Sequence, residues 1–219
     1  MSARRLPPSR PPGRAVSPGA MPTAFVFALV ATGLAAPSLA ARQQQPPSPA
    51  CSAPEARQFD FWLGEWSVRQ EILGADGGWL ELGARSRVSR ALAGCALVER
   101  WQGTVLFFWE GMTEPEAIDG LSVRAWDPAG GAWAIHWMDT RSPRFSDPYV
   151  GGFEDGTGTF LRATVGPGGA PGLARIRFYD IGEDALSWDL AVSADDGSSW
   201  TTVWRMAFTR VGDAPPPAG

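Results

Sequence analysis

Short runs in which apolar and polar residues alternate with a period of two recur along the chain from Arg57 onward, and turn residues separate them. Such alternation is typical of half-buried β-strands. After the first 40 residues, no stretch sustains the apolar period of an amphipathic helix over about three turns. The pattern therefore predicts an all-β chain. The expected strands are Glu65–Leu73, Trp79–Ala91, Ala96–Gly103, Leu121–Asp127, Ala132–Asp139, Tyr149–Glu154, Gly158–Val165, Leu173–Ile181, Ala185–Ser193 and Trp200–Val211.

The connections between these runs are short and rich in glycine, proline and aspartate, for example Gly74–Gly78, Asp127–Gly131 and Asp195–Ser198. Glycine supplies positive φ, and proline or aspartate starts a tight turn. Successive hairpins without long crossovers predict an antiparallel up-and-down sheet. Because a sheet of about ten strands curls or closes, and closure removes its exposed edges, we expect an up-and-down β-barrel. A two-sheet sandwich is the alternative that the same pattern allows.

The N-terminal region predicts a secretory signal peptide. Ala24–Ala36 is an uncharged apolar run of 13 residues that follows arginines and precedes Ser38-Leu39-Ala40, a small-x-small cleavage pattern. A membrane-spanning helix needs about 20 apolar residues, so we expect no stable membrane span after signal removal. Met21 is an alternative start. The expected organisation is a signal peptide at 1–40, a flexible linker at 41–56, a β-barrel domain at 57–211 and a disordered tail at 212–219, with export to the periplasm or the medium.

The net charge of the part expected to be exported disfavours negatively charged partners. The whole chain has a net charge of −4 and contains no lysine. Removing residues 1–40 leaves 15 arginines against 23 acidic residues, a net charge of −8. Such a balance disfavours nucleic acid or an anionic membrane surface as the main partner.

Export changes how the two cysteines are interpreted. Cys51 and Cys95 are the only cysteines, and an oxidising compartment permits a disulfide between them. A bridge closing a loop of this size stabilises a fold by roughly 3–4 kcal/mol in the chain-entropy model. Two unpaired thiols remain the alternative, because the sequence does not show the pairing geometry.

Several motifs between Cys51 and Val211 carry a resemblance to a known family. The motifs are Phe59–Trp66 (FDFWLGEW), Gly94–Trp101 (GCALVERW), Trp126-Asp127-Pro128, Trp133 with Trp137 and Asp139, and Asp196-Gly197 with Trp200. In these motifs the chain resembles the DUF1579-like proteins, a bacterial exported family of unknown function with a lipocalin-like (calycin-type) barrel. The resemblance implies a barrel with a short N-terminal segment plugging one end. It implies no reaction, because the family has no settled activity.

One region departs from the family pattern. Thr104–Asp119 (TVLFFWEGMTEPEAID) is longer and more aromatic than the short loop expected there. This segment is either a lid over the barrel mouth or an extra edge hairpin.

The Asp127–Gly131 turn predicts which side chains share a face. If Asp127 pairs with Ala132 around a four-residue loop, one face holds Ser122, Arg124, Trp126, Trp133, Ile135, Trp137 and Asp139. A slip of one residue would instead group Arg124 with His136. An aromatic face with a few polar groups resembles the wall of a ligand cavity. We therefore predict that the ligand-binding residues are Arg124, Trp126, Trp133, Trp137 and Asp139. Alternatively, these tryptophans fill the core and Arg124 pairs with Asp139 structurally.

Motifs for metals, cofactors and catalysis are nearly absent. One histidine and two cysteines cannot form an ordinary zinc site. The sequence contains no nucleophile elbow, phosphate-binding loop or dinucleotide fingerprint in its strand–helix context. His136 as a single haem ligand is disfavoured by its predicted place on the face opposite the tryptophans. We predict no metal, no cofactor and no catalytic residue.

The function favoured by these patterns is binding of a small apolar or aromatic molecule inside an exported barrel. One alternative is an enzyme that uses a buried carboxylate, Asp139 or Glu99, as acid or base. Another is an envelope scaffold protein with an outer aromatic patch from Phe107, Phe108 and Trp109. The sequence predicts neither the ligand nor the oligomeric state.

Overall fold

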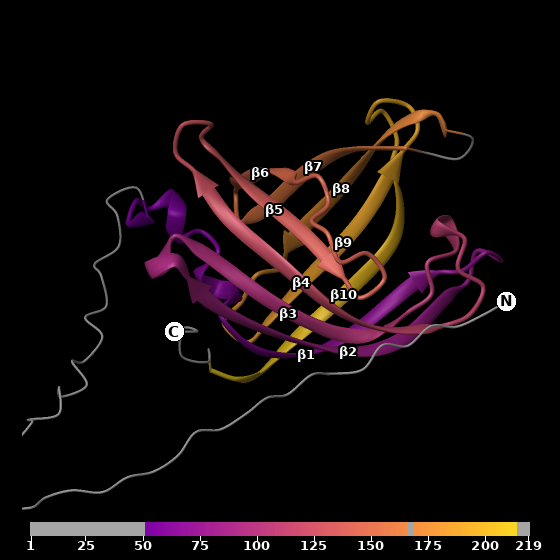
Figure 1. The fold of residues 1–219 in the computed structure, drawn as a ribbon, viewed down its shortest axis with the longest axis horizontal. Helices are drawn as coiled ribbons and strands as arrows, with labels where there is room; N and C mark the ends of the chain where they lie inside the picture. The colour runs from indigo at the N-terminus through magenta and orange to yellow at the C-terminus, as the bar shows by residue number, and fades with distance from the viewer. Residues whose placement is uncertain (1–50, 166–168, 214–219) are drawn as a thin grey trace, which may run out of the picture. The chain divides into compact units, whose positions relative to one another are not determined.

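The computed structural model describes residues 51–165 and 169–213, and within them ten antiparallel strands form one closed barrel (Figure 1). The predicted signal peptide lies outside the described residues. The strands are β1 (Gly64–Leu73), β2 (Trp79–Ala91), β3 (Ala96–Val105), β4 (Glu116–Asp127), β5 (Ala132–Asp139), β6 (Tyr149–Glu154), β7 (Thr157–Val165), β8 (Pro171–Tyr179), β9 (Ala185–Ser193) and β10 (Thr201–Gly212). The all-β barrel prediction is confirmed, and the sandwich is wrong.

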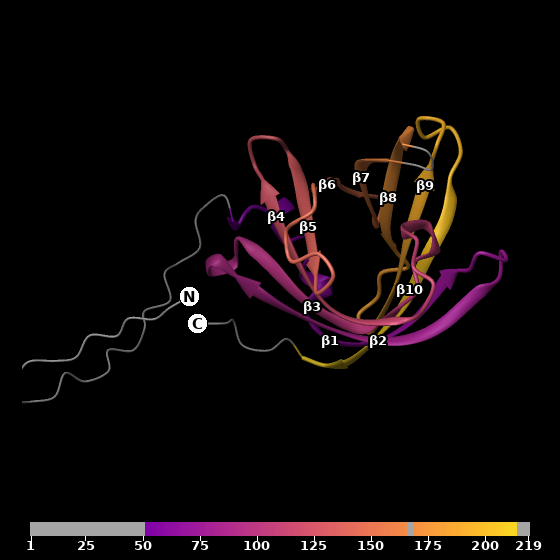
Figure 2. The same ribbon diagram turned by 45° about the vertical axis from the view of Figure 1, so that its right-hand side comes forward.

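Each strand pairs with its neighbours in the chain, and β1 pairs with β10 to close the sheet. The pairing between β5 and β6 is the shortest, since it covers only the three residue pairs from Trp133↔Gly151 to Ile135↔Tyr149. Beyond it, the loop 140–148 lies beside β5, and the Ser146 amide donates to the Trp137 carbonyl at 2.8 Å. The second view shows this loop between β5 and β6 (Figure 2). Loop residues therefore complete the wall where the sheet does not.

The hairpin between β4 and β5 has the predicted register. Asp127 pairs with Ala132 and Trp126 with Trp133. The Gly131 amide donates to the Asp127 carbonyl at 2.8 Å, and Gly131 has a φ of 62°, which glycine adopts without strain. Arg124 and Ile135 are consequently buried inside the barrel.

The residues before β1 plug one end of the barrel, which we call the closed end. Two short 3-10 helices, η2 (Glu55–Arg57) and η3 (Asp60–Trp62), carry Phe59 and Trp62 into the lumen, where both are buried. Cys51 forms a disulfide with Cys95. Residues 51–56, expected as linker, are thereby held against the barrel, and the plug implied by the family resemblance is present.

Alternation of strand direction decides which loops lie at the other, open end. The start of β1 is at the closed end, so the connections after the odd-numbered strands lie at the open end. Two of these connections are long: Leu106–Pro115, which contains η5 (Phe108–Glu110), and 140–148. Thr104–Asp119 is therefore no extra edge hairpin, because β3 continues to Val105, β4 begins at Glu116, and both strands pair within the closed sheet.

Candidate ligand-binding site

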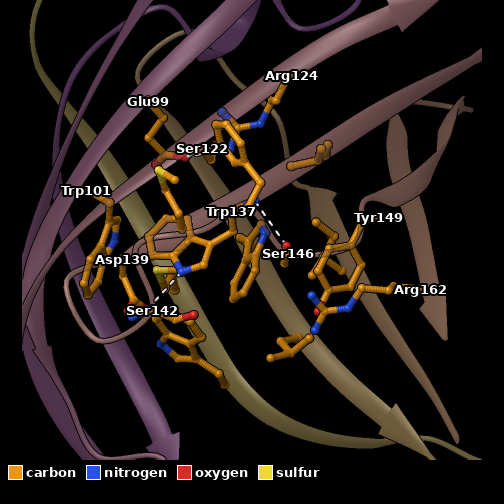
Figure 3. Close-up of a pocket in the computed structure, with 18 of the residues that line it drawn as sticks. Glu99, Trp101, Ser122, Arg124, Trp137, Asp139, Ser142, Ser146, Tyr149 and Arg162 are labelled. Atoms are coloured by element: carbon orange, nitrogen blue, oxygen red, sulfur yellow. Dashed lines mark hydrogen bonds and ion pairs between the residues drawn. The ribbon is translucent and has the colours of Figure 1, made fainter. Parts of the chain in front are cut away.

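The lumen toward the open end contains a cavity of about 390 Å³ (Figure 3). This volume lies in the range of sites that bind small molecules, about 300–1,000 Å³. Its wall includes five indole rings, and residues of the two long open-end loops line its mouth. The indoles belong to Trp62, Trp101, Trp137, Trp188 and Trp204.

Two glycines make room for these rings. A Cβ atom at Gly120 would lie 2.0 Å from the ring of Trp137, and one at Gly103 would lie 2.6 Å from the ring of Trp101. Any larger residue at either position would collide with an indole. The glycines in β3 and β4 therefore shape the aromatic wall of the cavity.

A buried ionic cluster lies at the inner end of the cavity. Glu99 on β3 and Arg124 on β4 are 5% and 4% exposed. Arg124 Nη2 donates to Glu99 Oε2 at 2.7 Å. The hydroxyls of Ser86 and Ser122 also donate to the Glu99 carboxylate, at 2.7 and 3.2 Å. The negative charge of Glu99 is thus balanced by one guanidinium, and two hydroxyls donate further hydrogen bonds to it.

Arg124 retains two donors that the cluster does not use. Its Nε and Nη1 are buried and have no hydrogen-bond partner among the described residues. The indole N–H groups of Trp62 and Trp101 are in the same state. The Arg124 guanidinium also lies 5.0 Å from the centre of the Trp62 ring. Since unpaired buried donors are costly, a hydrogen-bond acceptor that reached these atoms would be stabilised. Each atom has less than 1 Å² of accessible surface, so the side chains around it must move before a ligand contacts it.

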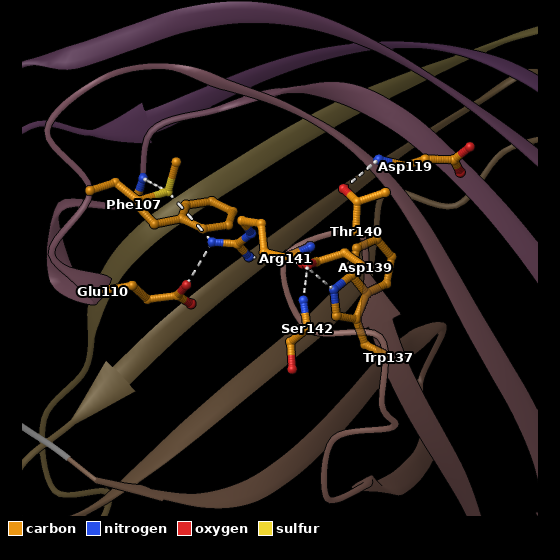
Figure 4. Close-up of polar contacts among 9 residues, drawn as sticks. Phe107, Glu110, Asp119, Trp137, Asp139, Thr140, Arg141 and Ser142 are labelled. Atoms are coloured by element: carbon orange, nitrogen blue, oxygen red, sulfur yellow. Dashed lines mark hydrogen bonds and ion pairs between the residues drawn. The ribbon is translucent and has the colours of Figure 1, made fainter. Parts of the chain in front are cut away.

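A second ionic cluster lies at the mouth (Figure 4). Asp139 Oδ2 accepts from Trp137 Nε1 at 3.1 Å and from Arg141 Nη2 at 2.8 Å, and Oδ1 accepts from the backbone amides of Arg141 and Ser142 at 2.9 and 3.2 Å. Burial raises the pKa of Asp139, but these hydrogen bonds outweigh it and hold the pKa below its ordinary value. Asp139 is therefore ionised at neutral pH.

Arg141 connects the two open-end loops. Its Nη1 donates to Glu110 Oε2 at 2.9 Å, and its guanidinium lies 5.1 Å from the centre of the Phe107 ring. Phe107 is buried and lines the cavity. The region predicted as a lid or an edge hairpin thus contributes part of the cavity wall.

Three of the five predicted ligand-binding residues line the cavity: Arg124, Trp137 and Asp139. The other two, Trp126 and Trp133, lie outside its lining. Trp133 packs against the plug, with its ring centre 4.9 Å from that of Phe59, and its indole N–H donates to the Glu55 carbonyl at 3.2 Å.

The structural pairing of Arg124 with Asp139 is wrong, because each has its own partner, Glu99 and Arg141 respectively. Among the lining residues that the pattern missed are Arg141, Tyr149 and Arg162. Arg162 could have been found, because it alternates with Gly158 and Phe160, which face inward on β7. Arg141 lies in a loop without periodicity.

Two further predictions concern a metal site and a membrane-spanning helix. Within residues 51–165 and 169–213, no three or more histidine, cysteine, aspartate or glutamate side chains are grouped to hold a metal ion. His136 is half-buried on the face of β5 opposite Trp137, and its Nδ1 lies 3.1 Å from the Ser146 carbonyl oxygen. None of the helices in the described part of the chain has the length and hydropathy to cross a membrane.

Scanned against models of known protein families the sequence matches none, and no curated protein matches it. Several solved structures match the chain. The S-type phycobiliprotein lyase CPES from Guillardia theta has a TM-score of 0.48 and 11% identity over 75% of this chain and 98% of its own. Rv2717c from M. tuberculosis has a TM-score of 0.48 and 15% identity over 73% of this chain and 98% of its own. A DUF3598-family protein of unknown function from Nostoc punctiforme has a TM-score of 0.24 and 8% identity over 72% of this chain and 99% of its own. The resemblance to the DUF1579-like family stays a prediction.

Proposed function

We propose that the barrel binds a small apolar or aromatic molecule in its lumen, with an acceptor group of the ligand held by Arg124. The observation that carries this proposal is the combination of a cavity of about 390 Å³, walled by indoles, with two unpartnered guanidinium nitrogens of a buried arginine. Indoles supply apolar area for affinity, and a few fixed donors supply orientation. Trp137 and Asp139 belong to this site, whereas Trp126 and Trp133 stabilise its floor.

The acid–base alternative has less support. A general acid or base needs a carboxylate with a pKa near the working pH and access to substrate. Glu99 and Asp139 are each paired with an arginine, and the pKa of Asp139 is lowered rather than raised. The scaffold alternative needs Phe107 on the outer surface, but Phe107 is buried beside the cavity. The side chain of Trp109 lies outside the described residues.

The proposal is tested with 6-propionyl-2-(dimethylamino)naphthalene, a neutral fluorescent ketone, and with 2-(dimethylamino)naphthalene, which lacks the carbonyl. We expect both probes to bind and to quench tryptophan fluorescence. Arg124→Lys keeps a cation beside Glu99 but removes the second edge of the guanidinium. It should weaken binding of the ketone on the order of tenfold and binding of the parent compound about twofold or less.

Two further variants serve as controls for this test. Replacing the pair by E99L/R124M removes both charges together, which avoids leaving Glu99 buried and unpaired. Arg177→Lys is the matched control, because Arg177 pairs with Asp189 outside the cavity. An equal loss of both probes in Arg124→Lys would argue against the acceptor role, and a lack of binding by both probes to the wild type would exclude the binding function.

We also propose that the chain is exported to the periplasm or the medium. The disulfide between Cys51 and Cys95 supports this, because such bonds persist in oxidising compartments. Fractionation of the native host, with thiol labelling before and after reduction, tests the proposal. Recovery of the protein in the cytosol with two free thiols would contradict it.

A further inference from the structure

Arg162 is a cationic side chain inside the barrel for which the binding proposal has no role. It lies on β7 in the inward-facing row with Gly158 and Phe160, and it lines the cavity. Its guanidinium lies 4.4 Å from the centre of the Tyr149 ring. Figure 3 shows these two residues together, on a different side of the cavity from Arg124.

The side chains that line the cavity carry more positive than negative charges. The lining contains four arginines and three carboxylates. Each carboxylate is already paired: Glu99 with Arg124, and both Asp139 and Glu110 with Arg141. Two of the arginines, the exposed Arg144 and the half-buried Arg162, have no carboxylate within ion-pair distance in the described part of the chain.

Tyr149 does not supply the missing negative charge. Burial raises the pKa of its phenol, Arg162 lowers it and Glu110 raises it, and the net pKa lies above the ordinary value. The phenol is therefore neutral at physiological pH. A half-buried guanidinium without a counter-ion is stabilised by an anion that enters the cavity.

Arg124 is a poorer place for that anion. Its charge is compensated by Glu99 in a buried cluster, so a second carboxylate there would leave a net negative charge in a low-dielectric site. A carbonyl oxygen can accept from one of the free nitrogens of Arg124, Nε or Nη1, without adding charge. The two arginines thus favour different ligand groups.

We propose that Arg162 and Tyr149 form an anion subsite near the open end, and that the ligand is an amphiphile with a neutral acceptor at Arg124 and a carboxylate or similar anion at Arg162. This inference rests on the proposed function. It adds the chemical class of the ligand and its orientation, with the charged end near the mouth.

Two dyes with the same ring system test the subsite. 8-Anilinonaphthalene-1-sulfonate carries a sulfonate that N-phenyl-1-naphthylamine lacks. In Arg162→Gln, we expect the dissociation constant of the sulfonate to rise on the order of tenfold and that of the neutral dye to change less than about twofold. Arg162→Lys should restore most of the sulfonate affinity, because it keeps the charge.

Arg175→Gln is the matched control. Arg175 also stacks on an aromatic ring, at 4.3 Å from the centre of the Trp200 ring, but it does not line the cavity. It should leave the affinity for both dyes unchanged. Near-ultraviolet circular dichroism of each variant confirms that the tryptophan environment is intact.

The outcomes separate the two proposals. If both dyes bind the wild type and Arg162→Gln weakens neither or both equally, the anion subsite is wrong and the binding function stands. If neither dye binds, both proposals fail. If sodium sulfate displaces the sulfonate dye more strongly than sodium chloride of equal ionic strength and leaves the neutral dye bound, the result supports the anion subsite.

Discussion

At the closed end of the barrel, the indole N–H groups of Trp66 and Trp133 donate to oxygens of the plug, whereas Trp101 at the cavity has an N–H without a partner among the described residues. Trp66 donates to the Trp62 carbonyl at 2.9 Å. All of these rings are buried. Trp62 in the plug also has an N–H without a partner among the described residues, and Trp137 and Trp204 at the cavity donate to Asp139 and Gln70. The two ends therefore differ neither in aromatic content nor in indole hydrogen bonding.

The two ends differ in the packing of their rings. Phe59 in the plug contacts five aromatic rings, with centre distances from 4.8 to 5.8 Å. In the cavity wall, Trp204 contacts Trp101 and Trp188 at 5.8 and 5.2 Å, but all three also border the empty volume. A ring enclosed on all sides stabilises the fold, and a ring with one free face is available to a ligand.

The largest effect is expected at the plug. Phe59→Ala leaves a cavity inside a closed aromatic cluster and should lower the free energy of unfolding by about 3–5 kcal/mol. Trp188→Ala, which enlarges an existing cavity, should cost about half as much because its neighbours already lack contacts on one side. Urea unfolding of both variants measures the difference. Equal losses of unfolding free energy in the two variants would show that the plug and the cavity wall do not differ in packing.

Removing the disulfide tests how the plug is held. The bridge joins residues 44 apart in sequence, so the C51S/C95S variant should lose about 3–4 kcal/mol of stability, chiefly through a less restricted unfolded chain. Because both cysteines lie at the closed end, dye affinity at the open-end cavity should stay within about twofold of the wild type under conditions where the variant is folded. A large loss of dye affinity would show that the two ends are coupled.

Gly120 gives a smaller effect at the open end. Gly120→Ala places a Cβ against the Trp137 ring, and such overpacking should cost about 1–3 kcal/mol and reduce dye affinity. Gly83→Ala on β2 is the matched control, since no atom lies within 4 Å of its added Cβ. The control should be neutral or slightly stabilising. Unaltered dye binding in Gly120→Ala would show that Trp137 does not define the site.

The register of β4 and β5 could be predicted because one turn determines it. Asp127-Pro128 starts the turn and Gly131 closes it, so the inward positions from Ser122 to Asp139 follow by alternation. Which part of that row faces a cavity depends on contacts with a distant segment, the plug. Alternation alone treats Trp133 and Trp137 as equivalent.

The order of the strands, unlike the alternation of side chains, predicts which of these tryptophans lie near the plug. In an up-and-down barrel the first strand begins where the fourth strand ends, so an N-terminal plug lies beside the turn after β4. Combining the predicted plug with the predicted barrel places Trp126 and Trp133 at the same end as the plug and leaves Trp137 toward the open end. The mouth residues Arg141 and Glu110 lie in loops, where no periodicity predicts contacts.

The smallest effect concerns the charge at the mouth. The folded protein holds the pKa of Asp139 below the ordinary aspartate value of 3.8, so the carboxylate contributes stability above that value and loses its contribution as the pH falls through the lower, folded-state pKa. Asp139→Asn should therefore be less stable than the wild type at pH 7, and the difference should shrink below about pH 3.8. Urea midpoints measured from pH 7 to pH 2 follow this difference. A difference that is constant with pH would mean that Asp139 acts at the open end through its shape and not its charge.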